Sequence, residues 1–379
     1  MFEKNAVVNG VGGFVGFYQV IDLLEKGYRV VASDLPNKVN EIGEILHRKD
    51  LMHMEEHFGE KLGKRGRLKD LGKRIIFVPA DLRKPEDLKN LFRVAQDYFK
   101  GPIQKFFHIA AIFDFAPPWS LFNEVNIKGT INALEAAKEA SVEKVILWSS
   151  GSVYRLGSIP QTENQPIEPK SYYSKSKAKQ EEIALSYQRK GMNIIILRPA
   201  AMYGKGSLYG TFIFLRMIAS GRMPFIVGRP KFTTASVNVK DVVNAAEFLS
   251  SLPYEKVSKR FFSDGLDDST IFNINDDTHS TLEEILFEVS RILKPTHNTR
   301  LWNIHVPLWL VRVAASWQKW LSKGYQVRPK LTKDSLDFIE KPSMMSNQKL
   351  KNMGYKLMYP NIKDQLEDLI KYYVKEGII

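Results

Sequence analysis

Tyr173 and Lys177 are the side chains whose types and spacing in this sequence best suit proton transfer. They lie four residues apart in the segment SYYSKSKAK, and on a helix this spacing puts both side chains on one face, one turn apart. An ammonium group close to a phenol favours the ionised phenol, so the spacing predicts that Lys177 lowers the pKa of Tyr173 from its usual value of about 10. The alternative interpretation is a solvated helix face that carries no chemistry.

A serine hydroxyl is the third group that this chemistry needs. The apolar run VILW at 145–148 is typical of a buried strand, and it ends in Ser149 and Ser150. A hydroxyl delivered from the end of such a strand would hold a substrate oxygen against the phenol of Tyr173. The three groups together indicate an acid–base site for alcohol and ketone chemistry.

A glycine-rich loop near the start of the chain could position a cofactor for that site. The short strand AVV at 6–8 is followed by NGVGGFVG and then by a helical pattern. Glycines in this context allow a tight turn and a close backbone approach to a pyrophosphate at the helix N-terminus. We therefore expect cofactor contacts from Gly10, Gly13, Phe14, Val15 and Gly16.

Asp34 ends the second predicted strand, RVVAS at 29–33, 18 residues beyond Gly16. A carboxylate at this point can bind both ribose hydroxyls of the adenosine half, and it would repel a phosphate on that ribose. The sequence therefore favours NAD over NADP. The alternative is an ordinary loop aspartate after a strand.

Further strands and helices alternate along the first half of the chain. We predict strands at 75–80 and 105–111 and a long helix from Asn126, so the sheet should be parallel and doubly wound. Asp81 and Leu82, after the third strand, would lie beside the adenine. Ala110 and Ala111, in the fourth, let the backbone lie close to the cofactor, and His108 should be a packing or hydrogen-bonding residue rather than the catalytic base.

The composition limits the classes of protein that this chain can belong to. Its 379 residues are 44% hydrophobic, which suits one large domain with an elaborated second lobe, or two domains. It has no cysteine, which excludes disulfides and thiolate metal sites and fits a reducing cytoplasm or a hot environment. The sequence shows neither a cleavable leader nor an apolar run long enough to span a bilayer, so we expect a cytoplasmic protein.

The net charge of +13 could indicate phosphates, nucleic acid or acidic lipid as partners. The lysines are spread along the whole chain, which favours a solubilising surface, and we expect no nucleic acid partner. The charged segment 37–74 is interpreted as a surface helical insertion. It contains His47, His53 and His57, but no companion ligands at a metal-site spacing, so we predict no metal.

The chain resembles the extended short-chain dehydrogenase/reductases of the NAD-dependent epimerase/dehydratase superfamily. Two departures from the family pattern are Asn9, where threonine is more frequent and we expect little consequence, and Asn238, where histidine is common. The resemblance is carried by ordered motifs: NGVGGFVG, Asp34, ADL at 80–82, HIAA at 108–111, NIKGT at 126–130, SSGSVY at 149–154, Tyr173 with Lys177, LRPAAMYGKG at 197–206, VNVKDV at 237–242 and FNIND at 272–276.

The resemblance implies roles for individual residues. Tyr173 is the general acid/base and Lys177 binds the nicotinamide ribose. Ser150 holds the substrate oxygen, with Ser149 and Ser152 as the fallback candidates. The remaining roles are a site-ordering Asn126, a cofactor contact at Pro199, and substrate contacts at Phe113, Gly151 and Tyr203.

The resemblance also implies a Rossmann-type sheet with a smaller C-terminal substrate-binding lobe. Residues 1–200 would form the NAD-binding domain, to which segments near 232–250 and 270–276 return. Residues 201–379 would form mainly the substrate-binding lobe. Helices at about 118–140 and 171–190 would build a homodimer.

Aromatic residues near the predicted pocket favour an apolar substrate over a sugar diphosphate, unless they are ordinary core. They follow HIAA, in the segment 112–119, and form a second group at Tyr209, Phe212 and Phe214. Gly151 and Ser152 stand where 4,6-dehydratases of the family carry Asp-Glu, which argues against dehydration. The stretch 231–236 lacks the Arg-Asp pair that sugar-nucleotide epimerases often show.

The segment 306–322 predicts an amphipathic helix with Trp309, Trp317 and Trp320 on its apolar face. It resembles a segment of the 3β-hydroxysteroid and sterol-carboxylate dehydrogenases. Such a helix could contact the inner face of an anionic membrane peripherally or wall off an apolar substrate. The alternative is packing against its own lobe.

We therefore predict an NAD-dependent oxidoreductase of the 3β-hydroxysteroid dehydrogenase-like branch. It would interconvert a secondary alcohol and a ketone on a sterol-, isoprenoid- or lipid-like substrate. The alternative enzyme is a sugar-nucleotide epimerase that retains its NAD. A protein that binds NAD without turnover is the third hypothesis, and the joint presence of Ser150, Tyr173 and Lys177 argues against it.

Overall fold

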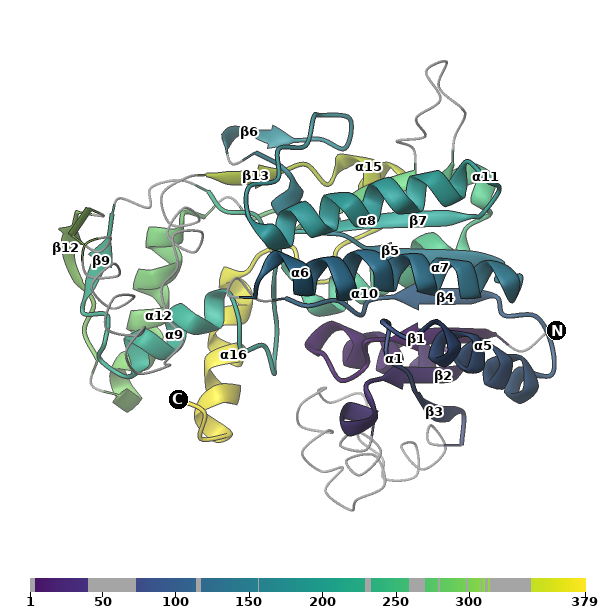
Figure 1. Ribbon diagram of the computed structural model, residues 1–379. Helices are drawn as coiled ribbons and strands as arrows, with labels where there is room; N and C mark the ends of the chain where they lie inside the picture. The colour runs from purple at the N-terminus through teal and green to yellow at the C-terminus, as the bar shows by residue number, and fades with distance from the viewer. Residues whose placement is uncertain are drawn as a thin grey trace.

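The centre of the molecule is a parallel sheet of seven strands (Figure 1). The computed structural model describes residues 4–39, 73–113, 117–155, 157–228, 233–258, 270–278, 280–297, 299–307, 309–310, 313 and 342–379. In spatial order the strands are β11 (Ile271–Ile274), β7 (Ile194–Pro199), β5 (Lys144–Trp148), β4 (Lys105–His108), β1 (Asn5–Asn9), β2 (Arg29–Asp34) and β3 (Ile75–Pro79).

This strand order confirms the predicted doubly wound sheet. The chain runs outward from β1 to β3 and then outward on the other side from β4 to β11, so the order reverses between β1 and β4. Ligands of such sheets bind at the carboxyl ends of the strands, beside the reversal point. The strands are short apolar runs because both faces of the sheet are covered, and every residue of β1 and β7 is buried.

Helices cover the two faces of the sheet and build two apolar cores. One core lies under α5 (Pro85–Phe99), α7 (Gly129–Glu139) and α8 (Tyr172–Gln188). The other lies under α1 (Phe14–Glu25) and α10 (Val239–Ser251), which contact each other. Ahead of α7 come α6 (Trp119–Phe122) and a π-helical turn η2 (Asn123–Lys128), so the helical stretch that the sequence placed from Asn126 begins earlier. The homodimer through α6, α7 and α8 stays a prediction.

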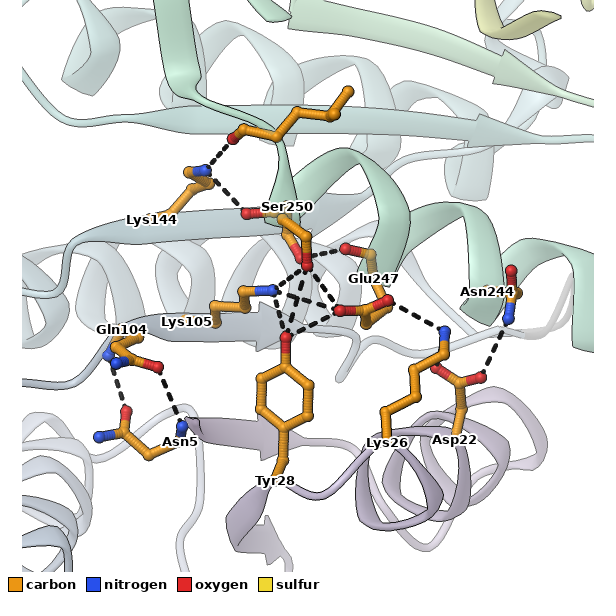
Figure 2. A network of polar contacts seen from close by, with 12 residues as sticks. Asn5, Asp22, Lys26, Tyr28, Gln104, Lys105, Lys144, Asn244, Glu247 and Ser250 are labelled. Atoms are coloured by element: carbon orange, nitrogen blue, oxygen red, sulfur yellow. Dashed lines mark hydrogen bonds and ion pairs between the residues drawn. The ribbon is translucent and has the colours of Figure 1, made fainter. Parts of the chain in front are cut away.

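A polar network ties α1 and α10 to the amino ends of the strands (Figure 2). Lys105, the first residue of β4, donates to the hydroxyls of Tyr28 at 2.5 Å and Ser251 at 2.7 Å. Both of those hydroxyls donate to Glu247 of α10, at 2.8 and 2.6 Å. Lys26, which follows α1, completes the network with a 3.0 Å ion pair to Glu247. The network lies at the amino ends of the strands, whereas the predicted site lies at their carboxyl ends.

The smaller lobe has an apolar core of its own. Figure 1 shows the smaller lobe at the left of the view, with α16 at its border with the sheet domain. Two short parallel strand pairs accompany it. The elements are β8 (Ala201–Tyr203), β10 (Ser236–Asn238), β9 (Phe225–Val227), β12 (Trp302–Val306), α9 (Thr211–Ala219), α12 (Leu282–His297) and α16 (Lys363–Lys375).

The chain returns from the smaller lobe to the sheet domain before its last helix. β13 (Ser343–Met345) pairs with β6 (Gly157–Gln161), and α15 (Gln348–Asn352) packs on β11. Leu350 and Tyr355 lie in the same core as α1 and α10, and the Tyr355 hydroxyl donates to Asp241 at 3.0 Å. The short elements α11 (Tyr254–Val257) and the 3₁₀ turn η3 (Gly151–Val153) complete the described structure.

Two predicted surface segments lie largely outside the described residues. Of the charged segment 37–74, residues 40–72 are outside, and with them His47, His53 and His57. The predicted helix 306–322 is wrong at its first residue, because Val306 ends strand β12; Trp317 and Trp320 lie outside. Within the described ranges no helix is long and apolar enough to cross a membrane, and no cluster of three or more His, Cys, Asp or Glu could hold a metal ion.

Candidate active site

The glycine loop after β1 is packed so tightly that Gly10 and Gly16 could not carry a side chain. A Cβ on Gly16 would lie 2.1 Å from the carbonyl oxygen of Gly10, and one on Gly10 would lie 2.7 Å from the backbone nitrogen of Ala110. Gly10 also has φ of +77°, a conformation that favours glycine. Helix α1 starts at Phe14 with no capping side chain and no acidic residue in its first turn. Its N-terminal end therefore fits the pyrophosphate of a dinucleotide.

Asp34 is held at the end of β2 by the same loop. One carboxylate oxygen accepts from the backbone N–H of Gly12 at 2.8 Å, and the other accepts from the N–H of Leu35 at 2.7 Å. A Cβ on Gly12 would lie 3.2 Å from Asp34 and 2.9 Å from the Cβ of Lys38, so these two side chains meet at Gly12. Asp34 thus lies where the adenosine ribose of a dinucleotide would bind next to its pyrophosphate, and the cationic side chain of Lys38 lies beside it.

Asp81 and Leu82 follow β3 on the same side of the sheet. Arg83 forks over the Asp81 carboxylate, with its Nη2 at 2.6 Å, and this hydrogen bonding lowers the pKa of Asp81. Leu82 packs on the first residue of α7, since a Cβ on Gly129 would lie 2.8 Å from the Cβ of Leu82. The carboxylate of Asp81 is therefore already hydrogen-bonded to Arg83.

Asn9 and His108 link β1 to β4 beneath the site. The Asn9 side chain accepts from the backbone N–H groups of Ile109 and Ala110, at 2.8 and 3.0 Å, and contacts His108 Nδ1 at 2.8 Å. His108 also contacts the Thr130 hydroxyl at 2.9 Å, and burial together with the charge of Lys177 lowers its pKa to about 3. His108 is a neutral packing residue, as predicted. Asn9, for which we expected little consequence, fixes the turn that carries Ala110.

Asn126 connects two parts of the site from within the π-helical turn η2. Its Oδ1 accepts from the Ile112 N–H at 2.8 Å, and its Nδ2 donates to Ser176 Oγ of α8 at 2.9 Å. The side chain is fully buried. It therefore holds the segment after β4 against the helix that carries Tyr173, which suits the site-ordering role implied by the resemblance; π-helical turns of this kind are frequent at functional sites.

The proton-transfer residues come together where β5 ends against α8. A side-chain hydrogen bond joins Ser150 to Tyr173. Lys177 lies one turn further along α8, and its Nζ donates to the carbonyl oxygen of Trp148 at 2.8 Å. Of the fallback serines, Ser149 donates to Glu181, and the buried Ser152 hydroxyl makes no hydrogen bond within the described structure. Ser150 alone of the three contacts the phenol.

The predicted lowering of the Tyr173 pKa is wrong in this geometry. The Lys177 Nζ lies 5.9 Å from the centroid of the Tyr173 ring, and burial raises the pKa of Tyr173 to about 12, while the hydrogen bond with Ser150 acts to lower it. Burial also lowers the pKa of Lys177 to about 7, against a smaller raising effect from the charge of Glu181. The sequence could not show this, because the spacing of two residues says nothing about how deeply both are buried.

An aromatic rim lies over Tyr173. The ring of Phe113 meets Tyr173 edge-on with centroids 5.0 Å apart, and it meets Tyr209 in the same way at 5.3 Å. Phe113 is 46% and Tyr209 52% exposed, so both present apolar surface beside the proton-transfer group. Phe212 and Phe214 instead belong to the core of the smaller lobe, where the alternative of ordinary core holds.

Tyr203 and Pro199 lie on the two strands that lead out of the sheet domain. Tyr203 is only 2% exposed and packs in the core of the smaller lobe, so its contact with a substrate stays a prediction. Pro199 ends β7, and its carbonyl oxygen lies against Gly151.

Met345 is a neighbour of the site that the sequence did not reveal. A Cβ on Gly151 would lie 2.5 Å from the Met345 sulfur, so β13 covers the residue that follows Ser150. Nearly two hundred residues separate the two along the chain. No local pattern marks such a contact, because it depends on the return of the C-terminal segment to the sheet.

The fold and the site together define a class of protein. A doubly wound sheet with a proton-transfer group at its carboxyl edge is the arrangement of dinucleotide-dependent α/β enzymes. The particular family follows from the sequence: the chain belongs to the NAD-dependent epimerase/dehydratase family, whose sequence model matches residues 6–263, more than half of the 379 residues.

The known relatives differ in what they act on. Sterol-4-alpha-carboxylate 3-dehydrogenase (decarboxylating) of Bos taurus is 28% identical over 257 residues, which is 65% of this chain and 61% of that protein. N-acetyl-alpha-D-glucosaminyl-diphospho-ditrans,octacis-undecaprenol 4-epimerase of Escherichia coli O157:H7 is 26% identical over 197 residues, 51% of this chain and 54% of that protein. The match thus spans less than two thirds of either relative.

The fold is similar to that of solved structures over the whole chain. UDP-glucose 4-epimerase of Thermus thermophilus, in complex with NAD, has a TM-score of 0.66 and 21% identity, and the likeness covers 99% of this chain and 100% of that one. At this level of identity the likeness establishes the fold.

Proposed function

We propose that this protein is an NAD-dependent oxidoreductase that interconverts a secondary alcohol and a ketone on an apolar substrate. The observation that carries the proposal is the aromatic rim: Phe113 stacks edge-on against Tyr173 and Tyr209 and leaves apolar surface exposed at the proton-transfer group. Rings so placed suit a sterol-, isoprenoid- or other lipid-like skeleton.

Different residues of the chain have different roles in this reaction. Tyr173 takes the proton of the alcohol, or returns it to the ketone in the reverse direction, and Ser150 holds the substrate oxygen beside the phenol. Lys177 binds the nicotinamide ribose and Asn126 keeps the α8 helix in register with the segment after β4. NAD, when bound in the glycine loop, supplies the hydride acceptor.

The choice of NAD over NADP rests on Asp34. Its carboxylate is fixed by two backbone N–H groups beside the glycine loop, so a 2′-phosphate on the adenosine ribose would meet a negative charge that cannot turn away.

The names of two relatives give the proposal its alternative. One relative is named for a sterol carboxylate, and the other is named as a 4-epimerase of a sugar joined by diphosphate to a polyprenol. Both names include a long apolar skeleton, which agrees with the rim. The second name favours an epimerase that retains its NAD, acting on a lipid-linked sugar, as the second candidate function.

Net production of NADH separates the candidates. Purified protein is incubated with NAD and, in separate reactions, with 3-hydroxysterols, long-chain isoprenoid alcohols, polyprenol-linked sugars and UDP-sugars. The proposal expects NADH absorbance with an apolar alcohol and none with UDP-sugars. An isomerised sugar without net NADH would overturn it in favour of the epimerase, and NAD binding with no product from any substrate would overturn both.

A further inference from the structure

Three consecutive residues at the end of β5 each bind a different residue of α8. The Trp148 carbonyl accepts from Lys177, the Ser149 hydroxyl donates to Glu181, and the Ser150 side chain hydrogen-bonds to Tyr173. The three partners on α8 are spaced by four residues, so they lie on one face of the helix. Glu181 is therefore the third member of a row that contains the two proton-transfer residues.

Glu181 is buried and bound on both of its oxygens. Its Oε1 accepts from Arg198 Nε at 2.9 Å and from Ser149, and its Oε2 accepts from Arg198 Nη2 at 2.7 Å. The side chains of Arg198 and Glu181 are only 4% and 3% exposed. A two-point contact of a planar guanidinium with a carboxylate fixes the position of both groups.

The far side of Arg198 is also held. Its Nη1 donates to the Tyr154 hydroxyl at 2.6 Å and to the Glu163 carbonyl oxygen at 3.3 Å. Tyr154 in turn donates to Asn273 of β11 at 2.8 Å. The ion pair therefore cannot shift without disturbing β5, β7 and β11 together.

In the part of the chain that the structure describes, the polar and charged groups that face Lys177 come from four elements. On α8 they are Tyr173 and Glu181, on β4 the neutral His108, on β5 the Trp148 carbonyl, and on β7 Arg198, which reaches Lys177 through Glu181. Glu181 supplies the only negative charge among these groups. The charge of Glu181 acts to raise the pKa of Lys177 against the lowering effect of burial.

We propose that Glu181 is a positioning residue that keeps Lys177 charged and the Ser149–Ser150 turn in place, and that Arg198 limits how strongly Lys177 senses the Glu181 charge. The inference deepens the proposed function, because it concerns the same proton-transfer site. It holds for any substrate of that site, since Lys177 would act on the cofactor.

The two partners must then act on Lys177 with opposite signs. Glu181→Gln removes the negative charge and leaves Arg198, so Lys177 loses its proton at a lower pH than in the wild type. Arg198→Met removes the positive charge and leaves Glu181 to favour the ammonium form, so Lys177 keeps its proton to a higher pH. A purely structural pair would weaken the site in both variants without this reversal.

The dissociation constant of NAD, measured by calorimetry from pH 6 to 9, is the readout. Affinity should fall as Lys177 loses its proton, and the midpoint of that fall should move down by about 1 pH unit in Glu181→Gln and up by a similar amount in Arg198→Met. In Glu181→Asp, which keeps a carboxylate, the midpoint should lie closer to that of the wild type than in Glu181→Gln. In Tyr154→Phe, which keeps the ion pair, the midpoint should equal that of the wild type.

Midpoints that move in the same direction in the two variants, or do not move, would overturn the inference. If Arg198→Met fails to fold, the isosteric Glu181→Gln decides on its own: a midpoint that does not fall overturns the inference. Because the readout is NAD affinity, it is separate from the proposed function. Shifted midpoints in a protein that oxidises no apolar alcohol would sustain this inference and reject that function.

Discussion

At the scale of single residues, burial governs the chemistry of the site. Tyr173 and Lys177 are both buried, and burial disfavours their charged forms, which moves the pKa of Tyr173 up to about 12 and that of Lys177 down to about 7. Near neutral pH the phenol therefore carries a proton that it can give to a ketone oxygen, and it must lose that proton before it can take one from an alcohol. The lysine exchanges its own proton readily near pH 7. The hydrogen bond from Ser150 is the contact that already favours the phenolate.

Replacement of Tyr173 by Phe should abolish turnover while NAD binding stays nearly intact. Only the proton-transfer group is lost, and such groups contribute about 10² to 10⁴-fold to rates. The neighbouring Tyr172, which is exposed and packs against Trp119, offers a matched control, since Tyr172→Phe removes the same hydroxyl outside the site. Steady-state rates and NAD titrations of both variants are the measurements. A Tyr173→Phe variant with most of its activity would remove Tyr173 from the role.

Replacement of Asp34 by Ala should weaken NAD binding and improve NADP relative to NAD. The substitution removes the negative charge that repels a 2′-phosphate, and it leaves the cationic Lys38 beside Gly12. The ratio of the dissociation constants for the two cofactors is the measurement. A ratio equal to that of the wild type would show that Asp34 does not read the ribose.

At the scale of elements, close contacts between backbone segments place the site. The glycine loop contacts the turn after β4 through Gly10 and Ala110, and it packs on itself through Gly16. These contacts leave no room for a side chain. The loop, the start of α1 and the turn after β4 therefore behave as one unit.

Gly16→Ala should lose most NAD affinity, whereas Gly13→Ala should lose little. The new Cβ at position 16 would meet the Gly10 carbonyl oxygen at 2.1 Å, so backbone must move, while at position 13 the same oxygen would be 3.3 Å away. Over-packing of this kind costs about 1–3 kcal/mol. Calorimetry with NAD and thermal unfolding of the two variants provide the comparison. Equal affinities would show that the loop adapts.

The elements of the sheet domain could be predicted from the sequence because each depends on local patterns. Apolar runs predicted the strands, and the glycines predicted the loop. Contacts between distant segments could not be predicted. Met345 against Gly151 and Glu181 against Arg198 both depend on how the chain returns, and the pKa of Tyr173 depends on burial.

At the scale of the whole molecule, the polar network around Glu247 couples folding to pH. Burial acts to raise the pKa of Glu247, but the hydrogen bond from Ser251 and the charges of Lys26 and Lys105 hold it at about 2. The folded pKa lies below the usual 4.5. The stabilisation is therefore complete above pH 4.5 and is lost as the pH falls toward 2.

Glu247→Gln should lower the free energy of unfolding at pH 7 by about 3 kcal/mol, because it leaves buried Lys105 without its counter-charge. The deficit relative to the wild type should shrink as the pH falls below 4.5. Glu182→Gln, which removes an exposed partner of Lys179, is the control and should cost less than about 1 kcal/mol. Urea unfolding at several pH values gives these energies. A deficit that does not depend on pH would contradict the assignment.

An apolar substrate held in a lipid phase predicts that the protein reaches a membrane surface. Trp302 and Trp309, on and just after β12, are 52% and 64% exposed, and the chain carries a net charge of +13. We expect cosedimentation with anionic vesicles at low salt, with part of the binding resistant to salt because of the apolar contact. Trp302→Ser with Trp309→Ser should reduce it, whereas neutral vesicles should bind less. No cosedimentation at low salt would favour a substrate taken from water.

The return of the C-terminal segment has a consequence for how the protein is made. The ribosome releases the chain from its N-terminus, so the glycine loop, β5 and α8 all emerge long before residues 342–358. Yet Met345 covers the residue after Ser150, Leu350 and Tyr355 complete the core beside α1 and α10, and Asn347 donates to the carbonyl oxygen of Asn275 at 2.8 Å. In a nascent chain that has already formed its cofactor loop, the core beside α1 and α10 therefore stays incomplete until this late segment has been synthesised. Chaperones that shield apolar surface during translation would bind this uncovered core in that interval.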